Sequence, residues 1–152
     1  MTRESRPELS EGVVARFQES LQRCLDQGDF IGAFYERFLA SSEKVRQKFA
    51  HTEFSKQRKV LERSLFMMAR AALRLEDGLA HLRHIAETHN RRRLDIGPHL
   101  YTSWMESLLL EVRNWDPCYS PEVEQAWRDA LGAGVDEMVR VYRESQTNRP
   151  PN

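Results

Sequence analysis

Apolar residues recur every three or four positions through most of the 152-residue chain, a spacing that predicts amphipathic helices. No stretch alternates apolar and polar residues with a run of β-branched side chains, as a half-buried strand would. We therefore predict an all-α protein. The predicted helices span residues 7 or 8 to 25, 29 to 39 or 40, about 43 to 49, 55 to 75, 79 to 89, 98 to about 114, and 120 or 121 to 142.

Capping residues, prolines and a glycine indicate where several of these helices begin and end. Asp29, Ser41 or Ser42, and Ser120 are suited to cap helix N-termini, because their side-chain oxygens accept hydrogen bonds from free backbone N–H groups. Pro98 and Pro121 suit first helical positions. We expect 76–78 (Glu-Asp-Gly) to end the long helix over 55–75, and the residues from about 145 to form a disordered polar tail.

Length and composition indicate one domain over 1–152, ordered over about 8–144 with polar tails at both ends. The chain has 23 Lys and Arg against 23 Asp and Glu, so no basic excess points to nucleic acid or an anionic membrane. We expect no membrane span and no secretory signal. Cys24 and Cys118 match no zinc spacing and suit free thiols in a reducing cytoplasm, so we expect a cytoplasmic protein.

One stretch combines an apolar face with a potential ligand. Leu79, Leu82, Ile85 or Ala86, and His89 share one face of the helix over 79–89. A histidine that points into the interior from a helix end can bind a metal through one ring nitrogen while a polar group holds the other. It can equally be a buried histidine with a hydrogen-bond partner. The stretch alone favours this second interpretation.

Four segments together resemble bacterial single-domain globins and the haem domains of flavohaemoglobins. They are Phe-Tyr-Glu-Arg-Phe at 34–38 with 43–49, Lys-Gln-Arg-Lys-Val-Leu at 56–61, Ile-Ala-Glu-Thr-His at 85–89, and the region from Tyr101 to Leu109 with Ala126 and Trp127. The resemblance extends from about residue 11 to 143. It implies a globin fold of six to seven helices around a haem pocket.

The same resemblance implies roles for individual residues. His89 would be the proximal iron ligand of haem b, and Tyr101 would support it. Tyr35 and Gln57 would be the distal residues that hold a bound gas. Phe49 would stack on the haem, and Leu61 would shape the pocket.

The residue types suit this chemistry. A haem needs an apolar slot, a neutral imidazole on one side of the iron and room for a gas on the other. Dioxygen held by a haem carries partial negative charge, so donors such as the Tyr35 phenol and the Gln57 amide stabilise it selectively. Without the resemblance, Tyr35 and Phe49 are equally well explained as core aromatics and Gln57 as an exposed helix residue.

Other candidates have weaker support. His51 is a modest candidate for a haem propionate contact or an alternative sixth ligand. His81 and His84 are predicted to face away from the apolar stripe, and His99 is a further possible ligand. The run at 91–93 (Arg-Arg-Arg) suits either propionate contacts or a solvated loop. Met67 and Met68 are predicted to pack in the core.

The sequence departs from the flavohaemoglobin pattern in two ways. No flavin and nicotinamide reductase follows the globin-like region, so we expect reduction of the iron to depend on a separate reductase. Tyr142 occupies the position of the family's glutamate, which buttresses the proximal histidine. Its loss should make His89 a less anionic ligand and weaken electron donation to the iron.

These observations lead to a functional expectation. We expect a haem-binding globin that reversibly binds dioxygen, nitric oxide and carbon monoxide, with nitric oxide dioxygenation as the candidate reaction. Whether the protein is an enzyme stays open. The alternatives are a haem-based gas sensor that signals to a protein partner and a haem-free helical interaction module.

Overall fold

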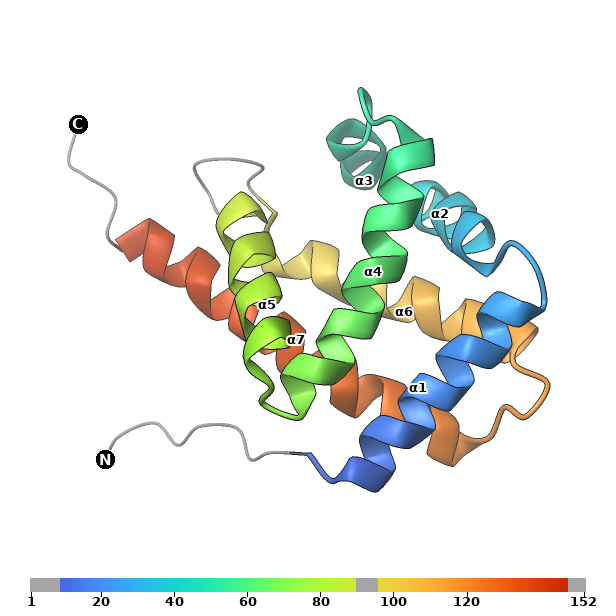
Figure 1. Cartoon of the computed structure of the whole chain (residues 1–152). Coiled ribbons are helices and arrows are strands. Elements are labelled where there is room, and N and C mark those ends of the chain that lie inside the picture. The colour runs from blue at the N-terminus through green and yellow to red at the C-terminus, as the bar shows by residue number, and fades with distance from the viewer. Residues whose placement is uncertain (1–8, 90–95, 148–152) are drawn as a thin grey trace.

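Seven helices make up the part of the chain that the structure, a computed structural model, describes: residues 9–89 and 96–147. They are α1 (Glu11–Asp26), α2 (Phe30–Ser41), α3 (Glu43–Lys48), α4 (Phe54–Ala72), α5 (Glu76–His89), α6 (Pro98–Trp115) and α7 (Pro121–Thr147). Within those residues there is no strand, so the all-α prediction is confirmed. Figure 1 shows α4 crossing in front of α6, with α5 beside α4 and α1 crossing in front of α7. No described helix has the length and apolarity needed to span a membrane.

Side-chain caps define where several helices begin. Asp29, Ser42 and Ser120 cap α2, α3 and α7 as predicted, with side-chain oxygens 2.9 to 3.1 Å from backbone N–H groups in the first turns. Ser10 caps α1 in the same way through Val13 N at 3.2 Å. The first helix therefore begins at Glu11, a few residues later than predicted. At the other end, α7 continues to Thr147, past the predicted start of the polar tail at Ser145.

The turn between α4 and α5 differs from the prediction. The long helix ends at Ala72, and Arg74 adopts the left-handed conformation with φ 63°. Gly78 is instead buried in the first turn of α5, where a Cβ atom would lie 2.3 Å from the backbone N of Ala71. The glycine thus permits close approach of α5 to α4 rather than ending a helix, because any side chain would collide with α4. This contact brings the two helices together at one end.

The main apolar core joins α1, α2 and α7 around Trp127. The Trp127 ring is fully buried and meets Phe17 edge-on, with 4.8 Å between ring centroids, and Phe30 at 6.1 Å. Edge-to-face aromatic pairs of this kind add to the stabilisation from burial itself. Helical spacing predicts a buried face on α1 that includes Val13 or Val14 and Cys24 or Leu25. The structure buries Val14 and Cys24 on that face.

A buried polar chain crosses this core. Trp127 Nε1 donates to Ser20 Oγ at 2.8 Å, and Ser20 Oγ donates to Asp116 Oδ2 at 2.6 Å. The Arg23 guanidinium donates to both carboxylate oxygens of Asp116, at 2.7 and 3.0 Å. Burial alone would raise the pKa of Asp116, but the hydrogen bonds from Arg23 and Ser20 outweigh it and hold that pKa below its usual value. The chain thereby ties α1 to α7 and to the loop after α6.

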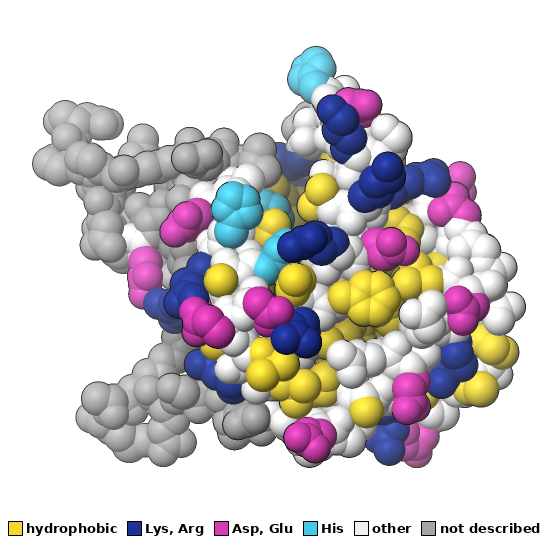
Figure 2. Space-filling view, in the orientation of Figure 1, with side chains coloured by type: hydrophobic (Ala, Val, Ile, Leu, Met, Phe, Trp, Pro, Cys, Tyr) yellow, Lys and Arg dark blue, Asp and Glu magenta, His cyan; other side chains and the backbone are white. Residues whose placement is uncertain are grey.

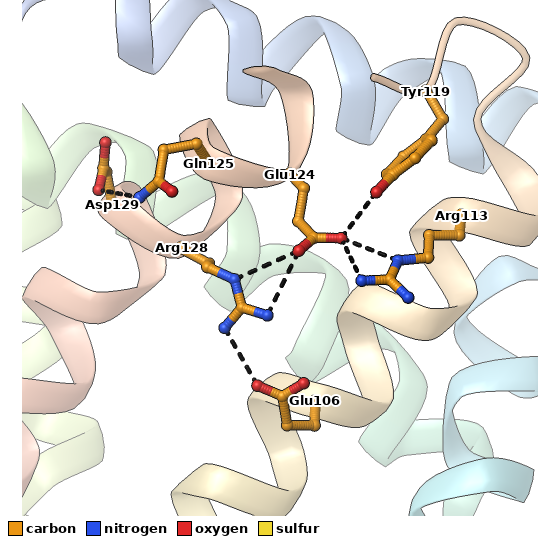
Figure 3. A network of polar contacts seen from close by, with 7 residues as sticks. All are labelled: Glu106, Arg113, Tyr119, Glu124, Gln125, Arg128 and Asp129. Atoms are coloured by element: carbon orange, nitrogen blue, oxygen red, sulfur yellow. Dashed lines mark hydrogen bonds and ion pairs between the residues drawn. The ribbon is translucent and has the colours of Figure 1, made fainter. Parts of the chain in front are cut away.

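A second polar network fastens α6 to α7 nearer the surface (Figure 3). The Glu124 carboxylate accepts hydrogen bonds from Arg113 Nε and from the Tyr119 hydroxyl, both at 2.8 Å. Arg128 bridges Glu124 to Glu106, which lies 3.0 Å away on α6. Isolated ion pairs at the surface contribute little to stability. In a network, a further ion pair costs less side-chain entropy because its partners are already ordered by their neighbours. The network therefore helps to set the angle between α6 and α7.

Asp116→Asn should lower the free energy of unfolding by about 2 kcal/mol at neutral pH, because it removes the charge that pairs with Arg23. The folded-state pKa of Asp116 lies below its unfolded value, so this stabilisation exists above the unfolded pKa and is lost as the pH falls through the folded pKa. Urea unfolding followed by circular dichroism should show the difference between wild type and variant shrinking on acidification.

Asp129→Asn is the matched control, since Asp129 accepts a hydrogen bond from Gln125 one turn back on the same helix. It should change the free energy of unfolding by less than about 0.5 kcal/mol. A pH-independent difference for Asp116→Asn would contradict the assignment of the effect to its charge.

Candidate functional site

A cavity of about 230 Å³ lies between α4 and α5 and is closed by side chains from α2, α3, α6 and α7. Its walls are largely apolar, with a few polar groups at separate points. All six site residues predicted from the sequence line it: Tyr35, Phe49, Gln57, Leu61, His89 and Tyr101. The structure therefore brings together residues from α2, α4, α5 and α6 and from the C-terminal end of α3.

His89 stands on one wall of the cavity, at the last residue of α5. Leu82 and Ala86 on the same helix are buried beneath it. Tyr101, in the first turns of α6 after Pro98, places its hydroxyl 3.0 Å from His89 Nδ1. Burial lowers the pKa of His89 to about 4, so the imidazole is neutral at neutral pH. Within the described residues Nε2 has no hydrogen-bond partner, and His89 thus offers an unprotonated nitrogen to a ligand.

A second polar pair enters the cavity from α2 and α4. Gln57 Nε2 donates a hydrogen bond to the Tyr35 hydroxyl oxygen at 3.1 Å. Burial raises the pKa of Tyr35 to about 12, although the hydrogen bond from Gln57 acts in the opposite direction. The phenol therefore keeps its proton at neutral pH. Because the amide donates to the oxygen, the phenolic hydrogen remains available to a third group in the cavity.

Aromatic and aliphatic side chains surround this pair. Phe49, at the end of α3, lies edge-on to Tyr35 and Phe38 at 5.9 Å and stacks with Phe54 at the same distance. Leu61 lies one turn beyond Gln57 on α4 and is 6% exposed. The surroundings of the phenol are therefore largely apolar, and hydrogen bonds are stronger in such surroundings than in water.

One of the histidine assignments needs a correction. His51 is exposed and does not line the cavity, and its contact with a haem propionate or with iron stays a prediction. His81 was predicted to face away, yet it lines the cavity and its Nε2 lies 3.0 Å from Ser64 Oγ on α4. The prediction considered α5 alone, whereas the approach of α4 covers this side of the helix. His84 and His99 are exposed. The arginines at 91–93 lie outside the described residues.

Sequence reasoning also missed several parts of the wall. Ser64 and Thr52 line the cavity, but a polar residue on a helix or in a loop carries no signal of such a position. Trp104 and Met138 fall on the apolar faces that helical spacing predicts for α6 and α7, and the structure places both at the cavity. Helical spacing identifies a buried face but not which neighbours it will meet.

The polar group behind the histidine is the Tyr101 phenol. No described Asp or Glu side chain hydrogen-bonds to His89 or to the Tyr101 hydroxyl. Burial is the cause of the low pKa of His89, and it also raises the pKa of Tyr101. His89 is therefore held by a neutral phenol.

A wider groove of about 810 Å³ runs between α6 and α7 on the other side of Tyr101. Its walls carry several charged side chains, including Glu106, Arg128 and Arg140, and it contains neither His89 nor Tyr35. The smaller cavity, in which neutral donors stand among apolar groups, is better suited to an apolar ligand.

Comparison with known structures gives the same fold. The crystal structure of PA3967 from Pseudomonas aeruginosa PAO1, described as structurally highly homologous to a human hemoglobin, matches with a TM-score of 0.82. The two sequences are 34% identical over 86% of this chain and 98% of that chain. No protein-family model matches the sequence, and a search of curated proteins found no match. The similarity of both sequence and structure shows that this chain belongs to the globin family.

Proposed function

We propose that this protein binds haem b as bacterial single-domain globins and the haem domains of flavohaemoglobins do, and that it reversibly binds dioxygen, nitric oxide and carbon monoxide. One observation carries the proposal. His89, held by Tyr101 at 3.0 Å, and the Tyr35–Gln57 pair line a single apolar cavity from different helices. That combination supplies a ligand for iron and hydrogen-bond donors for a gas in the same space.

The residues present fit a haem. The imidazole of His89 is neutral, as an iron ligand must be, and Nε2 is free of hydrogen bonds within the described residues. Phe49, Leu61 and Ile85 supply apolar surface for a flat macrocycle. When bound, the haem iron supplies the reversible attachment of a diatomic gas.

Tyr35 and Gln57 would act on the bound gas. The Tyr35 hydroxyl would donate its hydrogen to the partly negative gas, and Gln57 would orient the phenol by donating to its oxygen. Phe38 and Leu61 would exclude water from the same space, because both are almost completely buried and line the cavity.

Tyr101 would position His89 by accepting a hydrogen bond from Nδ1, which leaves Nε2 to face the cavity. A phenol is a weaker acceptor than a carboxylate, so His89 remains close to a neutral imidazole. It therefore donates less electron density to a metal than a histidine backed by a carboxylate would.

Replacement of His89 by alanine should abolish or severely weaken haem binding, because the described cavity wall then offers no imidazole in this position. The measurement is a titration of the apoprotein with haem, followed by the Soret absorbance. His84→Ala, on the same helix but exposed, should bind haem like wild type. An unchanged ferric spectrum in His89→Ala would rule out His89 as the iron ligand.

Tyr35→Phe should speed dioxygen dissociation roughly tenfold or more, since the lost hydrogen bond to a partly charged acceptor contributes about 1.5–3 kcal/mol. Stopped-flow displacement of dioxygen by carbon monoxide measures the rate. Tyr119→Phe removes a phenol outside the cavity and serves as the matched control. Equal dissociation rates in Tyr35→Phe and wild type would contradict the donor role.

The reaction that we propose for this site is nitric oxide dioxygenation. Nitric oxide and dioxygen combine to nitrate, and each turnover requires one electron from a separate reductase. With both gases and a reducing system, the protein should form many equivalents of nitrate per haem, measured by ion chromatography. Formation of no more than one equivalent would exclude sustained catalysis and leave gas binding as the function.

A further inference from the structure

The helices α4 and α5 touch at one end and are separated by the cavity at the other. Near the turn that joins them, Gly78 lets α5 approach the backbone of Ala71. At the opposite ends of the two helices, Gln57 and His89 line the cavity. Figure 1 shows the helices diverging from their common turn. The slot between α4 and α5 therefore widens toward the site proposed for the haem.

A hydrogen bond bridges this slot between its two ends. Ser64 of α4 and His81 of α5 both line the cavity, and Ser64 Oγ lies 3.0 Å from His81 Nε2. Burial and the charges of Arg63 and His84 lower the pKa of His81, so its ring is neutral at neutral pH. Both side chains are partly exposed, which places the pair between cavity and solvent. Figure 2 shows this face of the molecule, with histidine and basic side chains lying among apolar ones over α4 and α5.

The Ser64–His81 pair lies at one edge of the space that a haem would occupy. Along α4, Ser64 is seven residues from Gln57, which is about 10 Å along the helix axis. Along α5, His81 is eight residues from His89, which is about 12 Å. The described cavity-lining residues between these positions are apolar on both helices. A flat macrocycle attached to His89 and lying between the helices would therefore extend toward the pair.

We propose that the Ser64–His81 pair holds α4 and α5 together over one edge of a bound haem and slows the loss of that haem. The inference rests on the proposed haem-binding function. A haem leaves through the slot when the two helices move apart, and this movement breaks the hydrogen bond between them. Because the hydroxyl and the imidazole satisfy each other, the pair presents no unpaired polar group to the apolar part of the slot.

Another polar link joins the same two helices outside the cavity. Arg70 Nε of α4 donates to both carboxylate oxygens of Asp77 on α5, at 2.8 Å each. Both side chains are about half exposed, and neither lines the cavity. The link lies at the closed end of the slot, next to Gly78. Comparison of the two links therefore separates haem retention from general packing of α4 against α5.

The test measures the rate at which the ferric, haem-loaded protein loses haem to an excess of apomyoglobin, followed by absorbance. Ser64→Ala removes the hydroxyl, Ser64→Thr retains it, and His81→Leu removes the imidazole. A double variant combines Ser64→Ala with His81→Leu. Asp77→Asn is the matched control, because it weakens the link outside the cavity. The Soret spectrum of each ferrous carbonyl form reports on coordination of the iron.

Ser64→Ala and His81→Leu should each raise the rate of haem loss about threefold to tenfold, which is the effect of one net hydrogen bond. The double variant should lose haem no faster than the faster single variant, because both changes remove the same contact. Ser64→Thr and Asp77→Asn should stay within about twofold of wild type. The carbonyl spectra should be the same in all these proteins, because His89 is unchanged.

Three results would overturn the proposal. They are equal rates of haem loss for wild type and Ser64→Ala, an equal increase for Ser64→Ala and Asp77→Asn, and a rate for Ser64→Thr as high as that for Ser64→Ala. Failure of the proposed function has a different signature, because wild type itself then shows no Soret band after haem is added. In that case there is no haem to retain, and both proposals fail together.

Discussion

A neutral imidazole at the wall of an apolar cavity is the constraint on which the rest of this structure depends. A buried polar group must find a partner, yet a ligand nitrogen must remain without one. His89 meets both conditions because Tyr101 satisfies Nδ1 and leaves Nε2 open to the cavity. Burial lowers the histidine pKa to about 4, so the ring needs no countercharge. The positions of α5 and of the start of α6 follow from this contact.

The contacts that stabilise the fold lie in a different part of the molecule from the cavity. A cavity removes packing contacts, and interiors are otherwise as dense as organic crystals. The compensating interactions lie around Trp127, where α1, α2 and α7 pack tightly and the Ser20–Asp116–Arg23 chain crosses the core. The network centred on Glu124 holds α6 against α7. These contacts are away from Tyr35 and His89, so the helices around the cavity are positioned without filling it.

The polar side chains that line the cavity are mostly neutral. Within the cavity the polar side chains of Tyr35 and Gln57 are neutral, and no carboxylate among the described residues hydrogen-bonds to the histidine. Among the described Lys, Arg, Asp and Glu residues, Lys48 alone lines the cavity. The strength of hydrogen bonds inside the cavity therefore depends mainly on neutral groups in apolar surroundings.

The sequence by itself determined the local features. Helix caps at Asp29, Ser42 and Ser120, the buried faces of the helices, and the common cavity position of six predicted residues all follow from spacing and residue type, together with the family resemblance. Their functional roles stay predictions. Only the tertiary structure decided that Gly78 packs against Ala71, that His81 meets Ser64, and that Asp116 joins Ser20 across 96 positions. The physical reason is that periodicity describes one helix at a time, whereas these contacts depend on which second helix approaches and how closely.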